Sequence, residues 1–205
     1  MNDIQSRSLT FYRQRLRNVL GSPTQTQKKE ATTLTDYRPH WFTHEAINDY
    51  ESRAIAITGG VGSGKSDAGV IWHWHRCRLN HLSPFSWVVS PTFGKLWDSI
   101  IPRYKRTLES FGYIRNVHYT LLASPIIRLR YLYSGHEVHF CGADRPDLMV
   151  AVELSHALIE EPGRMKGQVF TEITERVRDS RAVLNQTLFT GVPQGVTEYA
   201  ELFDF

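Results

Sequence analysis

The sequence predicts an α/β protein in which helices cover both faces of a mostly parallel sheet. Three observations support this prediction: short β-rich apolar runs alternate with helical segments, one run ends in glycines, and another ends in two acidic residues. The chain has 205 residues, of which 41% are hydrophobic and 22% are charged, so it can bury a sizeable core. This composition excludes a disordered or fibrous protein.

Strands are predicted where apolar residues run almost without interruption, as they do in strands buried on both faces of a sheet. These runs are 54–58, 86–90, 157–159 and 186–190, and 126–133 with 137–141 form a hairpin that turns at Ser134-Gly135. Helices are predicted where apolar residues recur at helical spacing. These segments are 67–79, 96–111 and 165–178.

The start of the chain predicts a basic amphipathic helix at 4–20, followed by a polar linker. Residues 1–36 contain six basic residues against three acidic ones, an excess equal to the net charge of the whole chain, +3. We therefore divide the chain into an arm and linker at 1–36 and a main domain at 37–205. The arm either docks on DNA or a neighbouring subunit, or packs as a solvated helix on its own domain.

The pI, the cysteine count and the lack of targeting patterns limit the possible partners and cellular compartments of the protein. The sequence pI of 8.9 is compatible with a nucleic-acid partner but indicates one only weakly. Cys77 and Cys141 are the two cysteines of the chain, which excludes a disulfide scaffold and favours a reducing compartment. We find no signal-peptide pattern at the start and no apolar run near the roughly 18 residues of a membrane span. The sequence thus predicts a cytosolic protein.

A glycine-rich segment after the first predicted strand fits the pattern G-x-x-x-x-G-K-[ST]; it reads Gly59-Gly60-Val61-Gly62-Ser63-Gly64-Lys65-Ser66. Glycines let several backbone N–H groups point towards one anion, and the helix that follows adds its positive N-terminal end. Lys65 is expected to reach the β- and γ-phosphates of ATP, and Ser66 is expected to hold Mg²⁺. The alternative is a glycine-rich turn with no ligand.

The run at 157–159 leads directly into Glu160 and Glu161. A phosphate-binding loop needs a carboxylate at the end of a nearby strand to support the metal, and hydrolysis needs a base beside it. We predict that Glu160 supports Mg²⁺, through water, and that Glu161 orients and deprotonates the attacking water. The alternative is two exposed acids at the end of a strand.

With these motifs the chain resembles the ATPase domain of the large terminase subunits of tailed phages, from about residue 37 to the last residue. The likeness rests on 59–66, on Val88-Val89-Ser90-Pro91-Thr92-Phe93, on 138–147 before the acidic pair, and on Thr190-Gly191-Val192-Pro193-Gln194-Gly195. The resemblance implies a P-loop NTPase fold of the additional-strand type. It also implies an ATPase that uses ATP and Mg²⁺ to drive double-stranded DNA into a procapsid.

The same resemblance implies partners and a place of action. The partners are double-stranded DNA, the portal protein, the small terminase subunit and, once assembled, further copies of the chain in a ring around the portal vertex in the host cytoplasm. The segment from Thr190 resembles the family's coupling motif, with Thr190, Gly191, Pro193 and Gly195 as its functional positions. The hydroxyl of Thr190 could hydrogen-bond the γ-phosphate of ATP or its attacking water. The Gly/Pro turn that follows could convert that contact into a movement of the loop. An ordinary exit from a strand is the alternative.

The sequence departs from the family's pattern at three places. Val61 stands where many terminases carry an arginine, so another cation must stabilise the phosphoryl group. We favour Arg145 for this role over Arg103 and Arg128. The glutamine expected beside the adenine is absent, and the candidates for that pocket are Arg38, Trp41 and His44. The sequence contains no second acidic cluster that could hold two metals, so we expect no nuclease activity.

Other clusters are interpreted as structural. His73, Cys77 and His81 follow helical spacing, but the third lies too far along a helix axis to share one metal ion with the first, so we expect packing. The tryptophans at 72, 74, 87 and 97 are expected in the core. The segment 103–106 either contacts DNA phosphates or is a solvated helix face. Two other functions stay open: a helicase-like translocase, and an assembly module that binds ATP without hydrolysing it.

Overall fold

The structure, a computed structural model, describes residues 40–124, 126–145, 149 and 152–192. These residues belong almost entirely to one of two units of the chain, formed by 38–109 and 113–205. The predicted arm helix at 4–20 and its linker lie outside the described residues. Within the described part, no helix is both long and apolar enough to cross a membrane.

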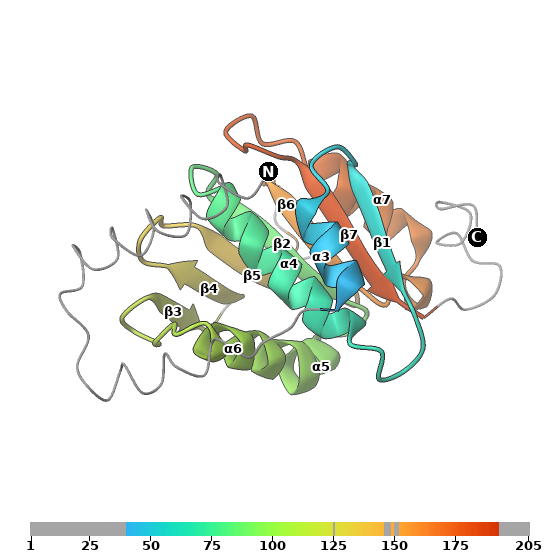
Figure 1. The fold of residues 1–205 in the computed structure, drawn as a ribbon, viewed down its shortest axis with the longest axis horizontal. Helices are drawn as coiled ribbons and strands as arrows, with labels where there is room; N and C mark the ends of the chain where they lie inside the picture. The colour runs from blue at the N-terminus through green and yellow to red at the C-terminus, as the bar shows by residue number, and fades with distance from the viewer. Residues whose placement is uncertain (1–39, 125, 146–148, 150–151, 193–205) are drawn as a thin grey trace. The chain divides into compact units, whose positions relative to one another are not determined.

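A seven-stranded sheet forms the centre of the described unit (Figure 1). In spatial order its strands are β1 (Ala54–Thr58), β7 (Gln186–Gly191), β6 (His156–Glu160), β2 (Phe85–Ser90), β5 (Glu137–Gly142), β4 (Ile127–Tyr131) and β3 (Tyr119–Leu122). The five strands from β1 to β5 in this order are parallel, and β4 and β3 continue the sheet as antiparallel strands. The predicted hairpin is therefore confirmed as β4 and β5.

The helices are α3 (Trp41–Asn48), α4 (Lys65–Leu79), α5 (Phe93–Lys95), α6 (Ile101–Ser110) and α7 (Gly167–Arg176), with a π-helical turn at Leu96–Ile100 and a 3₁₀ turn at Pro162–Arg164. The three predicted helices correspond to α4, to the continuous helical segment from α5 to α6, and to α7. The sequence patterns did not predict α3 and β3, because each is short and lacks a clear period.

Helices cover both faces of the sheet, as predicted. On one face, residues of α4 and α6 join a core with Val88, Leu158 and Leu188. On the other face, Ile173 of α7 packs in a second core with the next residue of each of those strands: Val89, Ile159 and Phe189. Successive strand residues point to opposite faces, so an apolar run without alternation is what a doubly covered sheet requires.

The four tryptophans that were expected in the core differ in burial. Trp72 and Trp87 are fully buried, so their expected place in the core is confirmed. Trp74 is partly buried against the same core. Trp97, however, is 49% exposed, which corrects the prediction. It lies in the π-helical turn, where the wider turn interrupts the α-helical spacing on which the prediction relied.

Buried Arg76 fastens α3 to α4 and β7. Its guanidinium donates hydrogen bonds to the carbonyl oxygens of Ala46, Ile47 and Asp49 at the end of α3, at 3.2, 3.0 and 2.8 Å. Its Nε also donates to Gln186 Oε1 of β7 at 2.7 Å. The carbonyls at the end of a helix lack partners within the helix, so this arginine supplies donors that the helix itself does not have.

We expect Arg76→Met to lower the free energy of unfolding by about 3 kcal/mol, because it leaves several buried carbonyl groups without donors. Urea denaturation monitored by circular dichroism measures this change. Arg106→Met, at an exposed position of α6, is the control and should alter the unfolding free energy by less than about 0.5 kcal/mol. Equal midpoints for both variants would contradict the assigned role.

Candidate functional site

The loop at residues 59–64 joins the carboxyl end of β1 to the start of α4. Gly62 and Gly64 have φ values of 80° and 82°, a region that side chains disfavour, so these two positions require glycine. A Cβ on Gly64 would also lie 2.9 Å from the ring of His40, just before α3. The Gly59 N–H donates to the Gly191 carbonyl at 3.3 Å, so the loop is tied to the end of β7.

Lys65 is the first residue of α4 and lies largely buried, with 8% of its surface exposed. Its Nζ donates to the carbonyl of Gly60 at 3.0 Å, so the side chain folds back over the loop. The ammonium group therefore sits beside the same backbone segment whose amides are expected to surround a phosphate. Ligand binding would require it to exchange this carbonyl for phosphate oxygens.

Ser66 and Glu160 are in contact although 94 residues separate them, since the Ser66 hydroxyl donates to Glu160 Oε2 at 3.2 Å. The absence of a side chain at Gly69 permits this approach. A Cβ there would lie 2.9 Å from Leu158 Cδ1 and 3.5 Å from Glu160 Oε1. Gly69 thus lets α4 pack close to β6 and brings the two predicted metal-site residues together.

The Glu160 side chain is 1% exposed, and burial raises its pKa to about 7, although the Thr190 and Ser66 hydroxyls act in the opposite direction. Its Oε1 is buried without a donor in hydrogen-bonding geometry. A buried carboxylate oxygen with unused acceptor capacity beside a serine hydroxyl suits a hard cation such as Mg²⁺ or its bound water. Ser66 and Glu160 therefore fit the metal that the sequence predicted.

Without nucleotide, the raised pKa of Glu160 should make stability depend on pH. Between pH 4.5 and 7 the folded state holds a proton that the unfolded state has lost, so the unfolding free energy falls as pH rises and levels off above 7. We expect Glu160→Gln to become more stable than the wild type by up to about 3 kcal/mol across this interval. Urea titrations at pH 5 to 8 measure the difference, and parallel curves would refute it. The exposed Glu175→Gln variant is the control.

Glu161 follows β6 in the left-handed region, with φ 50° and ψ 54°, which is unusual for a residue with a side chain. A hydrogen bond of 2.6 Å from its N–H to the Thr190 carbonyl holds this conformation. Its carboxylate forms ion pairs with Lys95 and, at 3.3 Å, with Arg164. The turn therefore directs the side chain of Glu161 away from the path of the strand and towards α5.

Sequence reasoning did not identify Lys95. It ends the short helix α5 after β2, within the helical segment that follows the terminase-like run 88–93, where a single lysine carries no local signal. Only the sheet order, which places β2 beside β6, brings Lys95 to Glu161. The structure thus adds a cation to the candidate site.

Thr190 lies beside Glu160 in the register of β7 and β6, and it is fully buried. The next residue, Gly191, pairs with Thr58 of β1, immediately before the loop. The ends of three adjacent parallel strands therefore bring the loop, the acidic pair and the start of the predicted coupling motif together at one edge of the sheet. Pro193 and Gly195 lie outside the described residues.

The three candidate arginines occupy different places. Arg103 pairs with Asp67 of α4 at 2.5 Å, and its charge also lowers the pKa of Glu160. Arg145 stacks on the ring of Phe93, with 4.6 Å from Cζ to the ring centroid. Arg128 pairs with Glu137 on the antiparallel side of the sheet. Among these candidates, Arg103 is the one whose charge acts on an acidic residue of the site.

Two of the three candidates for the adenine pocket can be placed, and Arg38 lies outside the described residues. Trp41 is 70% exposed at the start of α3, which rules out a place in the core. His44 is also exposed on α3. Because His40 lies against Gly64, the start of α3 is close to the loop.

The strand order and the position of the loop define the additional-strand class of P-loop folds, since β7 lies between the strand that precedes the loop and the strand that ends in the acidic pair. The chain's fold is that of the ATPase domains of phage large terminases, as the following similarities show.

The ATPase domain of the large terminase of Thermus phage P74-26 matches with a TM-score of 0.59 and 20% identity over 83% of this chain and 71% of that one. The HK97 bacteriophage large terminase matches with a TM-score of 0.62 and 12% identity, over 87% of this chain and 40% of that one. The N-terminal domain of the DNA packaging ATPase of bacteriophage phi29 matches with a TM-score of 0.53 and 13% identity, over 82% and 85%. No family model and no curated protein sequence matches the chain.

Proposed function

We propose that this chain is the ATPase motor domain of a phage large terminase, which hydrolyses ATP to move double-stranded DNA into a procapsid. The observation that carries the proposal is the contact between Ser66 at the loop and Glu160 at the end of β6. The contact supports Ser66 and Glu160 as a shared Mg²⁺ site next to the glycine-rich loop, and Glu161 is the residue after Glu160. The fold likeness to phage packaging ATPases supports the same function.

In this proposal the loop amides of residues 59–66 and the ammonium of Lys65 bind the phosphates of ATP. Ser66 and Glu160 would hold Mg²⁺, and a bound Mg²⁺ would supply positive charge to offset that of the phosphate oxygens. Glu161 accepts a proton from the attacking water, so it must exchange Lys95 or Arg164 for that water. Arg103 lies near enough to Glu160 to lower the pKa of that carboxyl, so it could stabilise the phosphoryl group within its own chain. Arg145 is the candidate for the same role in the site of a neighbouring subunit.

Trp41 is the proposed adenine contact. It is exposed and directly follows His40, which lies against Gly64 of the loop, and an indole can stack on a purine ring. The proposal keeps His44 and Arg38 as further candidates for this pocket. Thr190 and Gly191 would couple hydrolysis to movement, because the backbone bond from Gly59 to Gly191 joins the phosphate loop directly to the end of β7.

The proposal includes an assembly. The main domain at 37–205 would act in a ring of identical chains at the portal vertex in the host cytoplasm, with the portal protein and the small terminase subunit as partners and the basic arm at 1–36 docking on DNA or a neighbour. The chain spans 40% of the HK97 terminase. Because the sequence contains no second acidic cluster that could hold two metals, the proposal includes no nuclease activity.

ATP turnover with and without double-stranded DNA tests the proposal. We expect Mg²⁺-dependent release of phosphate that rises several-fold with DNA, and we expect no nicking of a supercoiled plasmid in the same tubes. Nucleotide binding without turnover, even at high protein concentration with DNA present, would favour the assembly module instead. Cleavage of the plasmid would overturn the assignment without nuclease activity.

A further inference from the structure

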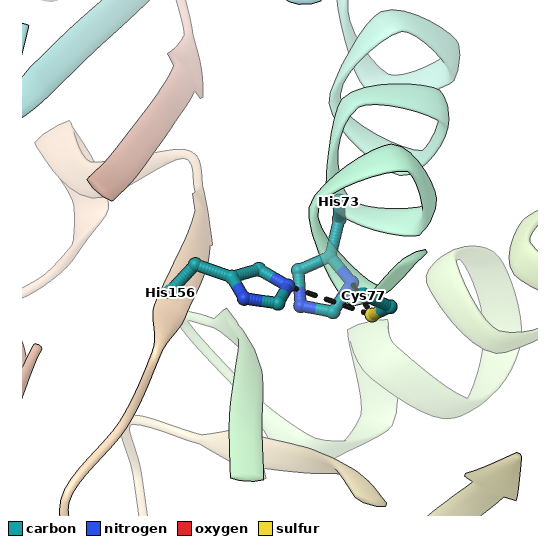
Figure 2. A group of neighbouring side chains, drawn as sticks. All are labelled: His73, Cys77 and His156. Atoms are coloured by element: carbon teal, nitrogen blue, oxygen red, sulfur yellow. Dashed lines mark hydrogen bonds between the residues drawn. The ribbon is translucent and has the colours of Figure 1, made fainter. Parts of the chain in front are cut away.

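Three potential metal ligands meet in the core between α4 and β6 (Figure 2). His73 and Cys77 project from successive turns of α4, and His156 is the first residue of β6. All three side chains are fully buried, and their ligand atoms lie within 4.8 Å of one another. In the sequence, His73 and Cys77 follow helical spacing with His81, and there we expected packing and no shared metal ion; His81 is exposed and does not join the cluster.

Two of the three separations in the cluster fit tetrahedral zinc geometry. Cys77 Sγ lies 3.6 Å from His73 Nδ1 and 3.5 Å from His156 Nε2. Zinc bonds of about 2.3 Å to sulfur and about 2.0 Å to nitrogen, at tetrahedral angles, place a sulfur and a nitrogen roughly 3.5 Å apart. Both measured separations agree with this value. The hydroxyls of Ser86 and Tyr104 lie 3.8 and 3.9 Å from the same sulfur and close the remaining sides.

Hydrogen bonds behind His156 orient its ring for this role. Its Nδ1 lies 2.8 Å from Ser155 Oγ, and that hydroxyl already donates to the Phe85 carbonyl. Nδ1 must therefore carry the proton and donate it to Ser155, which leaves the lone pair of Nε2 directed at Cys77. The Asn80 amide is farther from Nδ1, at 3.4 Å, and donates to the Leu184 carbonyl at 2.9 Å. A supporting contact of this kind is typical of metal-binding histidines.

The two imidazole nitrogens and the sulfur of the cluster are ligands that a borderline-soft metal ion prefers. Burial lowers the pKa of both His73 and His156 below the usual value, which favours neutral rings that keep a lone pair. Two imidazoles and one thiolate form the ligand set that zinc prefers over Mg²⁺ or Ca²⁺. The Cys77 thiol releases its proton to solvent as the sulfur–metal bond forms.

From this geometry we propose that His73, Cys77 and His156 bind one zinc ion that fastens α4 to β6. The site has a structural role because its ligands are fully buried. His73 is eight residues from Lys65, about 12 Å along the helix, and His156 is four residues from Glu160, about 13 Å along the strand. The ion would therefore join the second half of α4 to the first residue of β6, away from the glycine-rich loop and the acidic pair.

The competing account is a core held only by hydrogen bonds. In that account Tyr104 donates to His73 Nδ1, at 3.0 Å, and the Cys77 thiol donates to His156. The two accounts differ in metal content, which can be measured on the full chain without nucleotide. A failure of the zinc site would therefore leave the proposed ATPase function untouched.

Elemental analysis of the 205-residue chain, grown with added zinc and purified without chelators, is the first test. We expect about one zinc per chain in the wild type and in Cys141→Ser, and at least a 10-fold loss in Cys77→Ser and His156→Gln. Cys141 is a matched control because it is also buried but lies in β5 outside the cluster. Less than about a tenth of an ion in the wild type, or full zinc in the Cys77 and His156 variants, would overturn the proposal.

A second measurement keeps the test valid if the ligand variants do not fold. Cys141→Ser leaves Cys77 as the single thiol of the chain, so a thiolate-to-cobalt charge-transfer band in the Co²⁺-loaded variant can arise only from Cys77. We expect this band together with the strong visible absorption of tetrahedral Co²⁺. A folded Cys141→Ser chain that takes up cobalt without the band, or takes up none, would refute the site. Copper or nickel in place of zinc in the elemental analysis would overturn the choice of ion.

Discussion

Replacing Glu161 by glutamine is expected to reduce ATP turnover by about 10²- to 10⁴-fold while leaving nucleotide affinity within a few-fold of the wild type. Glutamine keeps the size and the hydrogen-bonding reach of the side chain but cannot accept the proton of the attacking water. The unusual backbone at this position aims the carboxylate towards Lys95 and Arg164, so the variant also tests whether charge, and not shape, is required.

Phosphate release under saturating ATP and Mg²⁺ measures the rate, and calorimetric titration with an ATP analogue measures the affinity. Glu175→Gln is the matched control, because Glu175 is an exposed glutamate of α7 outside the candidate site. A turnover equal to that of the wild type would remove Glu161 as the base. A loss of binding as large as the loss of rate would instead assign Glu161 to the nucleotide pocket.

Lys65→Ala is expected to weaken binding of ATP and ADP by roughly 10²- to 10⁴-fold. Two charge-assisted hydrogen bonds to phosphate oxygens are together worth about 3 to 6 kcal/mol, and alanine removes both. The folded chain should keep its stability, because in the nucleotide-free protein the ammonium makes one hydrogen bond, to the Gly60 carbonyl.

Calorimetric titration with ADP and with an ATP analogue measures this loss, and thermal denaturation confirms that the variant folds. Lys166→Ala, at an exposed lysine before α7, should bind both nucleotides as the wild type does. Unchanged affinity in Lys65→Ala would mean that the glycine-rich segment is a turn without a ligand, and the proposed function would fall with it.

The local sequence was enough to predict the glycine-rich loop and the strands that lead into the candidate site. Gly62 and Gly64 occur where the backbone needs positive φ, so the loop could be recognised from its glycines. Strands β6 and β7 are buried on both faces, so their apolar runs identified them and, with them, the positions of Glu160 and Thr190.

Tertiary structure decided which of these residues meet. Strand order, which no local pattern encodes, set Thr190 beside Glu160 and brought Lys95 to Glu161. Among the three candidate arginines, only the packing of α6 against α4 distinguished Arg103.

The cluster of His73, Cys77 and His156 also depends partly on local sequence and partly on tertiary structure. The sequence placed His73 and Cys77 on one face of a helix, and a helix alone cannot bend a third ligand back to the same ion. The missing partner, His156, comes from a strand 79 residues after Cys77. Contacts over such distances depend on how helices pack on the sheet, so the sequence determined the loop, the strands and the acidic pair, while the assembly of each site required the folded chain.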